Sequence, residues 1–347
     1  MKSTSPSMRG RALFIVLLSA LALAAYVATS AGPAYATFPG PNGRITFARS
    51  FPATNTEDIF SIRADGTDER QLTFDAPGHA SIFSDWSPDG SRITIDSDRF
   101  NNGTDDIVDI FTMKADGSDI VQLTSHDGFN GEPVYSPDSQ TIAFESDRGI
   151  GPPAQGIYLM NSSDGSNVRR VTFPPSGEFD IIPHFAPDGT RIAFTRLPVD
   201  CRFNNGRFPF PAGCLAAGYV VNVDGSHLVQ ITPWGFDTGI SDWSPDGTKI
   251  AFTKNFDNQH PGSKIDIYVV DPDGKHPKNL TNNPPIAGPC PLVISLGAKW
   301  SPDGSKMVFR QFTCDGGGLW IMNADGSGRH ALTANFEEAS DWGPNQD

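Results

Sequence analysis

The stretch "ISDWSPDGTKIAFTKN", residues 240–255, joins an aromatic residue, a proline turn and an apolar run. Related phrases recur along the chain: "FSDWSPDGSRITIDSD" at 83–98, "PVYSPDSQTIAFESD" at 133–147, "PHFAPDGTRIAFTR" at 183–196 and "AKWSPDGSKMVFRQ" at 298–311. An aspartate repeated at one position is either a member of a catalytic set or part of a structural unit.

Turn chemistry favours the structural interpretation. In Ser-Pro-Asp-Gly the proline presets φ, the aspartate favours the turn, and the glycine accepts a positive φ before the next strand. Ser139 replaces the glycine in one copy, so we expect that turn to be strained or differently shaped. The aspartates assigned to these turns are Asp89, Asp138, Asp188, Asp246 and Asp303.

A second phrase alternates with the first, for example "DIYVVDPDGKHPKNLT" at 266–281, and it occurs six times. The turn prolines are Pro41, Pro88, Pro137, Pro187, Pro245, Pro302 and Pro344, with spacings of 42 to 58 residues. Each period holds four short strands, which we label a to d in chain order. Repeats of this length built from short strands indicate a β-propeller.

The ends of the chain complement each other. Residues 41–47, "PNGRITF", contain strand b without a preceding strand a, and residues 339–344, "ASDWGP", contain strand a without a following strand b. Strand 339–342 should therefore complete the sheet begun at 44–73. The predicted fold is all-β: a six-bladed β-propeller with four antiparallel strands per blade. Closing the ring in this way hides the edges of the sheets.

The alternation of S-P-D-G-x-x-I-A-F with I-Y-x-M-x-x-D-G-x-x-x-x-x-L-T resembles the repeat of the TolB-like six-bladed propeller family. The resemblance covers residues 37–347 and implies the fold and the family rather than a specific function. TolB carries an additional α/β domain ahead of its propeller, which we do not expect in this chain.

The first 36 residues have the pattern of a cleaved secretory signal peptide. Lys2, Arg9 and Arg11 precede an apolar run from Ala12 to Ala28, and "AYA" at 34–36 offers small residues for cleavage. An uncleaved membrane anchor is the alternative. We therefore expect residues 1–36 to be a signal peptide and an extracellular, cell-envelope or periplasmic location.

The net charge of the chain is −14. A negative charge of this size repels nucleic acid and anionic lipid. It either keeps the protein soluble or favours cations or basic proteins as partners. The sequence predicts no integral membrane domain after cleavage, and a monomer.

The four cysteines of an exported chain suggest two disulfides, and three pairings are possible. The loop positions favour Cys201–Cys214 and Cys290–Cys314.

Antiparallel order places the a–b and c–d turns on one face of the ring, the turn face. The longer b–c loops and d–a connections lie on the other, the loop face. Variable loops on a rigid scaffold usually carry binding, so we expect a protein or peptide partner on the loop face. Three aromatic residues of the longest b–c loop could anchor it or pack the loop onto the ring: Phe203, Phe208 and Phe210.

The residue before the aromatic end of each strand a should point toward the central channel. These residues are Asp85, Val134, His184, Asp242, Lys299 and Asp341. Asp85, Asp242 and Asp341, joined by His184, could bind a divalent cation, the one possible cofactor. Alternatively, each aspartate caps backbone N–H groups or pairs with a nearby cation.

The leading functional hypothesis is a non-catalytic scaffold, because no nucleophile elbow, H-E-x-x-H, P-loop or dinucleotide motif occurs. The alternative is a metal-assisted lyase or hydrolase acting on a carbohydrate, as in oligogalacturonate lyases of related repeat type. Its candidate catalytic residues are His79, His126, His184 and Lys299. A third possibility is a propeller that once served a peptidase domain and now works alone.

Overall fold

The computed structural model describes the following residues: 41–100, 108–125, 128–148, 155–198, 201, 214–236, 238–255, 264–283, 293–314, 316–335 and 337–345. All of them belong to the compact unit Tyr35–Asp347. In these ranges the regular structure is β-strand, and no helix is long and apolar enough to cross a membrane.

The strands of the described residues pair into groups of four, each running from the inside of the ring outward. The first group is β25 (Glu337–Pro344), β1 (Asn42–Phe51), β2 (Thr56–Arg63) and β3 (Arg70–Gln71). The second and third are β4 (Ser81–Trp86), β5 (Arg92–Ser97), β6 (Asp109–Lys114) and β7 (Val121–Gln122), then β8 (Asn130–Tyr135), β9 (Thr141–Ser146), β10 (Gly156–Asn161) and β11 (Arg169–Arg170).

The remaining groups follow the same order. The fourth is β12 (Glu178–Phe185), β13 (Arg191–Pro198), β14 (Leu215–Asn222) and β15 (Val229–Gln230), with the short β16 (Gly235–Phe236) also on β14. The fifth and sixth are β17 (Gly239–Trp243), β18 (Ile250–Lys254), β19 (Lys264–Val270) and β20 (Lys278–Asn279), then β21 (Val293–Trp300), β22 (Lys306–Thr313), β23 (Gly316–Asn323) and β24 (His330–Ala331).

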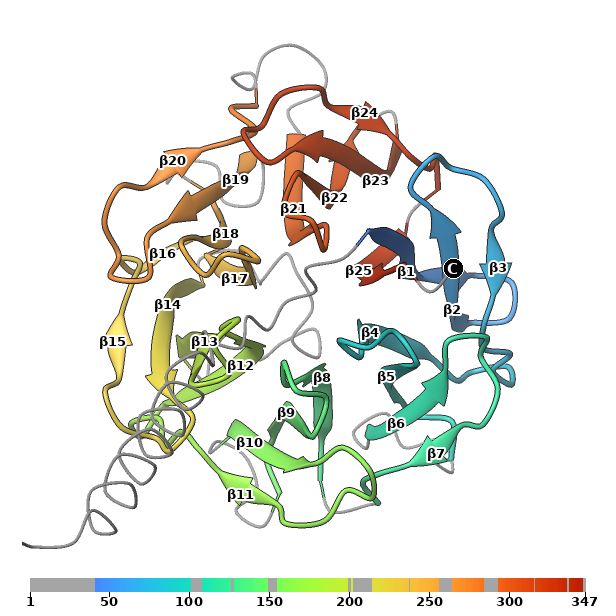
Figure 1. The fold of residues 1–347 in the computed structure, drawn as a ribbon, viewed down its shortest axis with the longest axis horizontal. Helices are drawn as coiled ribbons and strands as arrows, with labels where there is room; N and C mark the ends of the chain where they lie inside the picture. Colours follow the sequence, from blue (N-terminus) through green and yellow to red (C-terminus); the bar gives the residue numbers. More distant parts are fainter. Residues whose placement is uncertain are drawn as a thin grey trace, which may run out of the picture. The chain divides into compact units, whose positions relative to one another are not determined.

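The groups are arranged around a central axis (Figure 1). Each inner strand contacts the next in the order β25, β4, β8, β12, β17 and β21, and β21 contacts β25 again. The inner strands therefore form a closed circle around a channel, as expected for a β-propeller.

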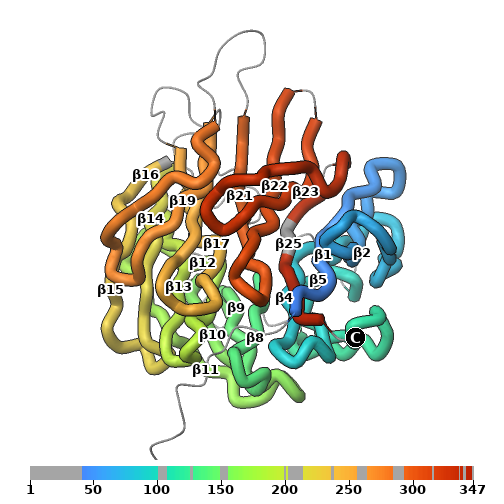
Figure 2. Tube along the Cα trace, turned by 45° about the horizontal axis from the view of Figure 1, so that its top comes forward, coloured from blue at the N-terminus to red at the C-terminus, as the bar shows by residue number. Residues whose placement is uncertain are grey.

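The predicted closure strand is confirmed. β25 pairs antiparallel with β1, and Trp342 lies opposite Ile45. Figure 2 shows the red β25 beside the blue β1. The carboxylate of Glu337, fully buried, accepts a hydrogen bond at 2.8 Å from the guanidinium of Arg49 across this pair. The ring is closed by the two ends of the chain.

The fifth and sixth groups are joined by a contact that the repeat did not predict. At their loop-face ends, β19 and β21 pair in parallel through Lys264 with Val293 and Ile265 with Ile294. Strand backbone groups that would otherwise lack partners are satisfied in this way.

The hydrophobic core is divided among the spaces between neighbouring groups. One cluster joins Val134 of the third group with Phe194 of the fourth, and another joins Phe47 of the first with Val308 of the sixth. Burial on both faces explains the uninterrupted apolar character of the second strand in each group.

The repeated turns have the predicted chemistry. Asp89 Oδ1 accepts hydrogen bonds from Ser87 Oγ at 2.7 Å and from the Ser91 N–H at 2.9 Å, and Gly90 has a φ of 68°. Ser139 has a φ of 60° at the glycine position. A left-handed backbone disfavours a residue with a Cβ, so this turn is strained as predicted.

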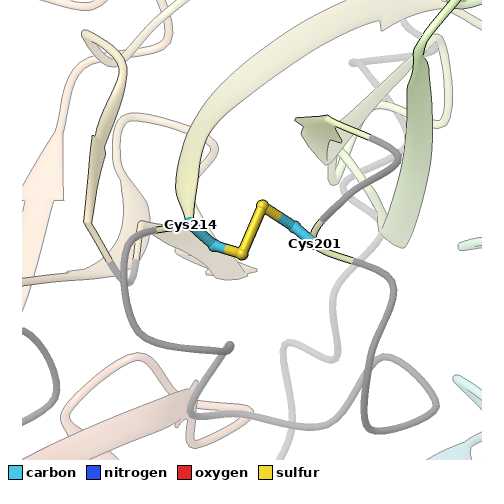
Figure 3. The surroundings of a disulfide bond; sticks show 2 residues. All are labelled: Cys201 and Cys214. Carbon is cyan, nitrogen blue, oxygen red and sulfur yellow. A yellow bond between two sulfur atoms is a disulfide. The ribbon is translucent and has the colours of Figure 1, made fainter.

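The first predicted disulfide is present: Cys201 and Cys214 are bonded, with their Cα atoms 5.5 Å apart (Figure 3). The two cysteines are 13 residues apart in the sequence and lie between β13 and β14. Cys314 is also disulfide-bonded, while its predicted partner Cys290 lies outside the described residues.

Candidate functional site

The residues predicted to face the channel lie one residue before the aromatic position of each inner strand. They are Asp85 in β4, Val134 in β8, His184 in β12, Asp242 in β17, Lys299 in β21 and Asp341 in β25. Two cavities flank this layer, and both are lined by Asp85, Val134 and His184. The turn-side cavity also contains the prolines of the repeated turns, and the loop-side cavity lies toward the loop face.

The three aspartates of the layer accept hydrogen bonds from the neighbouring inner strand. Asp341 Oδ2 accepts from the Trp86 N–H at 2.9 Å, and Asp85 Oδ2 accepts from the Tyr135 N–H at 2.8 Å. Asp242 Oδ2 accepts from the Trp300 N–H at 2.8 Å. Each carboxylate thus links its own strand to the next one around the ring, which is the capping role weighed as an alternative to metal binding.

The Lys299 ammonium supplies positive charge to this layer, in which Asp341 is buried and Asp85 and Asp242 are half-buried. Burial raises the pKa of Asp85 well above its usual range, with the Asp341 charge adding to the rise and Lys299 opposing it. Burial raises the pKa of Asp242 to about 7 and also raises the pKa of Asp341, and Lys299 opposes both shifts. One lysine therefore partly compensates three desolvated carboxyl groups.

The metal hypothesis stays a prediction. Within the described ranges, no group of three or more His, Cys, Asp or Glu side chains is arranged to hold a metal ion. The carboxylates predicted as ligands, Asp85, Asp242 and Asp341, already bind backbone N–H groups and interact with Lys299.

His184 contacts the same lysine. Its Nδ1 lies 3.2 Å from Lys299 Nζ. Burial lowers the pKa of His184 well below its usual range, and the Lys299 charge lowers it further. A neutral imidazole whose Nδ1 faces an ammonium accepts a hydrogen bond there, so its proton lies on Nε2.

The loop-side cavity has a volume of ≈ 80 Å³, enough for several water molecules or a small ligand group. Its walls are largely apolar, with Phe83, Ile182 and Ile240 among them. Its polar and charged lining residues include Glu132, His184, Lys299, Arg310 and Glu338. Apolar walls with a few convergent polar groups are typical of a ligand site.

Irregularities in the inner strands shape this cavity. The pairing registers of β8, β12 and β21 shift just before the channel layer. Residues with positive φ lie at these shifts: Glu132 at 49°, Ile182 at 57° and Gly297 at 66°. A left-handed backbone is unusual for glutamate and more so for a β-branched isoleucine, and such strain clusters at functional sites.

Glu132 is held from several sides. Its N–H donates to Asp96 Oδ2 at 3.1 Å, and its carboxyl group is hydrogen-bonded to that of Glu145. Burial, followed by the charges of Glu145 and Asp96, raises the pKa of Glu132 well above its usual range. Burial and the neighbouring charges therefore favour the protonated form of Glu132.

The sequence analysis did not identify Glu145, Asp96 and Arg310 as site residues. These residues follow the third apolar position of the second strand in their groups, where the repeat also has Ala48, Thr195 and Thr253. The hydrogen bonds from this position reach the next inner strand: Glu145 Oε2 accepts from the Ile182 N–H at 3.2 Å. The signal available in the sequence was a position at which polar and charged residues interrupt an otherwise regular repeat.

Other predicted site residues lie elsewhere or cannot be placed. His79 Nδ1 lies 3.1 Å from the Asp98 backbone oxygen, and His79 is absent from the described lining of the loop-side cavity. His126, Phe203, Phe208 and Phe210 lie outside the described residues, so their roles stay predictions.

The closed circle of antiparallel sheets with a cavity at its centre defines the class of β-propellers. Residues 100–204 match the family described as PD40, TolB beta propeller domain. The crystal structure of TolB from Acinetobacter baumannii has a TM-score of 0.64 at 21% identity, with 87% of this chain and 67% of that chain covered. The chain has the β-propeller fold, and residues 100–204 match the TolB-type propeller family that the repeat resembles.

Two curated relatives are similar over part of the chain. An uncharacterized protein of Agrobacterium fabrum is 28% identical over 201 residues, which are 57% of this chain and 62% of that protein. The uncharacterized peptidase YuxL of Bacillus subtilis is 28% identical over 211 residues, 53% of this chain and 31% of that protein. The chain therefore spans less than two thirds of the length of either relative.

Proposed function

We propose that this protein is an exported, non-catalytic scaffold that binds a peptide segment of a protein partner at the loop-side cavity. The observation that carries the proposal is the combination of apolar walls with buried polar atoms that have no partner among the described residues, including Glu132 Oε2 and His184 Nε2. A buried polar atom without a hydrogen bond is costly, so a ligand that satisfies it gains affinity.

Export is supported by the Cys201–Cys214 disulfide, because such bonds persist in oxidising compartments. The net charge of −14 favours a partner with basic surface around the bound segment. Repulsion of phosphates makes nucleic acid an unfavourable partner.

Filling the cavity tests the proposal. Ser241 lines it and is buried, so Ser241→Phe should occlude it. Ser91→Phe, at an exposed position of a repeated turn, is the matched control. We expect capture of a partner from a cell-envelope extract to fall at least tenfold with Ser241→Phe and to persist with Ser91→Phe, with cross-links mapped by mass spectrometry to the loop face.

Equal capture by both variants, or cross-links confined to the turn face, would contradict the proposal. A third variant without residues 202–213 tests whether Phe203, Phe208 and Phe210 anchor the partner. Loss of capture with intact thermal stability would assign them that role.

A carbohydrate-active enzyme is the second candidate. One observation favours it: the neutral imidazole of His184 lines the cavity in contact with Lys299, and such a group can act as an acid or base. Turnover of uronide polymers or glycosides that His184→Ala abolishes would favour the enzyme. The absence of turnover across such a panel would favour the scaffold.

A further inference from the structure

In the described part of the chain, the buried side-chain atoms without hydrogen-bond partners include Glu132 Oε2 and His184 Nε2. Both residues line the cavity, and each is only 6% exposed. They come from the neighbouring inner strands β8 and β12. Native proteins rarely leave such atoms unsatisfied, and each exception calls for an explanation.

The hydrogen-bonding role of His184 Nε2 follows from the contact at the other ring nitrogen. Lys299 Nζ, 3.2 Å from Nδ1, is a donor only. Nδ1 must therefore accept, and the neutral ring carries its proton on Nε2. His184, a lining residue of the cavity, thus carries a donor, Nε2–H, that has no acceptor among the described residues.

The role of Glu132 Oε2 follows from the neighbouring Glu145. Two donors bind the Glu145 carboxylate: Gln155 Nε2 to Oε1 at 2.9 Å and the Ile182 N–H to Oε2 at 3.2 Å. These bonds stabilise the ionised form of Glu145, so the proton shared by the carboxyl pair belongs to Glu132. Because Oε2 has no partner, Glu132 donates through Oε1, and Oε2 is an uncharged acceptor.

The charged groups of the lining have partners of opposite sign. Lys299 interacts with Asp85, Asp242 and Asp341. Arg310 lies 3.9 Å from Glu338 Oε2. Beside these paired charges, His184 Nε2–H and Glu132 Oε2 are an uncharged donor and an uncharged acceptor set among apolar side chains.

We propose that the loop-side cavity recognises an uncharged carboxamide, such as the side chain of asparagine or glutamine in a partner peptide. Its carbonyl oxygen accepts from His184 Nε2–H and its amide N–H donates to Glu132 Oε2. A carboxamide carries a donor and an acceptor on separate atoms, and a site built for such a group rejects analogues that leave its polar atoms unpaired. This inference rests on the proposed function and specifies the chemistry of its ligand.

Three small probes of similar shape test the preference on the full chain: propionamide, propionate and propylammonium. We expect propionamide to bind at least tenfold more tightly than either ion at pH 7, measured by chemical-shift titration of the His184 ring signals. Tighter propionate would assign the site to anions, and tighter propylammonium would show that Glu132 is ionised. Either result overturns the proposal, as does the absence of propionamide binding.

Variants of Glu132 separate the assigned protonation from a charge effect. Glu132→Gln keeps a donor toward Glu145 and a carbonyl toward the cavity, so propionamide affinity should stay within threefold of the parent. Glu132→Met removes both and should weaken binding at least tenfold. A tenfold loss with Glu132→Gln in a chain of unchanged thermal stability would contradict the assignment. If Glu132→Met does not fold, the three probes and the Glu132→Gln variant still test whether the cavity prefers a carboxamide.

The outcome is independent of the partner-capture experiment. Loss of capture with Ser241→Phe without a carboxamide preference leaves the proposed function standing and removes only this inference. Capture that ignores Ser241→Phe contradicts the proposed function itself.

Discussion

The two cavities of the channel use their polar groups differently. Beside the turn-side cavity, Asp85, Asp242 and Asp341 each accept a backbone N–H from the next inner strand. Among the described residues, the unpartnered polar atoms of its lining include the indole donors of Trp86 and Trp342. The loop-side cavity instead combines an unpartnered donor with an unpartnered acceptor, on His184 and Glu132.

The difference separates stability from binding. The aspartates recur at one position of the repeat and join neighbouring sheets, as a scaffold requires. Glu132 and His184 depart from the repeat at their own positions, and Glu132 has a strained backbone. In a repeated structure, the residues that interrupt the pattern and lack partners are the better candidates for function.

The largest expected effect on stability comes from removing the positive charge of Lys299, which faces the three aspartates of the channel layer. Lys299→Met should lower the free energy of unfolding by about 3–5 kcal/mol at pH 7, since it leaves buried carboxylates without their cation. Lys275→Met, at an exposed lysine paired with Asp273, should leave the free energy of unfolding nearly unchanged. Urea unfolding measures both, and equal effects would show that Lys299 is not a buried counter-charge.

Removing one aspartate bond should have a smaller effect. Asp341→Ala leaves the Trp86 N–H without its acceptor and should cost about 1–3 kcal/mol. Asp341→Asn keeps an acceptor oxygen and should cost less. Thermal unfolding compares the two, and a larger loss with asparagine would show that the negative charge, rather than the hydrogen bond, matters at this position.

The pH dependence of stability should reflect the raised pKa of Asp242, about 7. The folded state holds this proton more tightly than the unfolded state, so this contribution to stability is greatest below pH 4 and is lost as pH rises to 7. Asp242→Asn removes it, so the stability of the variant relative to the parent should increase from pH 5 to pH 7.5. A pH-independent difference in urea unfolding would contradict the assigned burial.

The smallest expected changes in stability come from relieving positive φ at one residue near each face. Ser139→Gly should leave stability unchanged or raise it by up to about 1 kcal/mol, whereas in Glu132→Gly the same relief is offset by loss of the buried carboxyl group that bonds Glu145. Only Glu132→Gly should abolish propionamide binding, since Ser139 lies in a repeated turn. Loss of binding in both variants, or in neither, would end the functional distinction between the two faces.

Much of the fold could be predicted because its determinants are local. The turn at Ser87–Gly90 and its counterparts follow from residue preferences, and the pairing of 339–342 with β1 follows from the incomplete repeats at the chain ends. The pairing of β19 with β21 could not be predicted, because it depends on where two strand ends meet. The same limit applies to the register shifts that turn Glu132 and Ile182 into left-handed backbone.

The sequence by itself determined the repeated unit, the closing of the ring and the six positions that face the channel. Turn preferences, strand alternation and repeat spacing act within a few residues or a single period, so the linear pattern carries them. Tertiary structure alone decided which side chains touch: Lys299 and His184 meet across 115 residues, and the carboxyl group of Glu132 is hydrogen-bonded to that of Glu145. Such contacts depend on the width of the channel and on irregular pairing of the inner strands, and no local preference encodes either one.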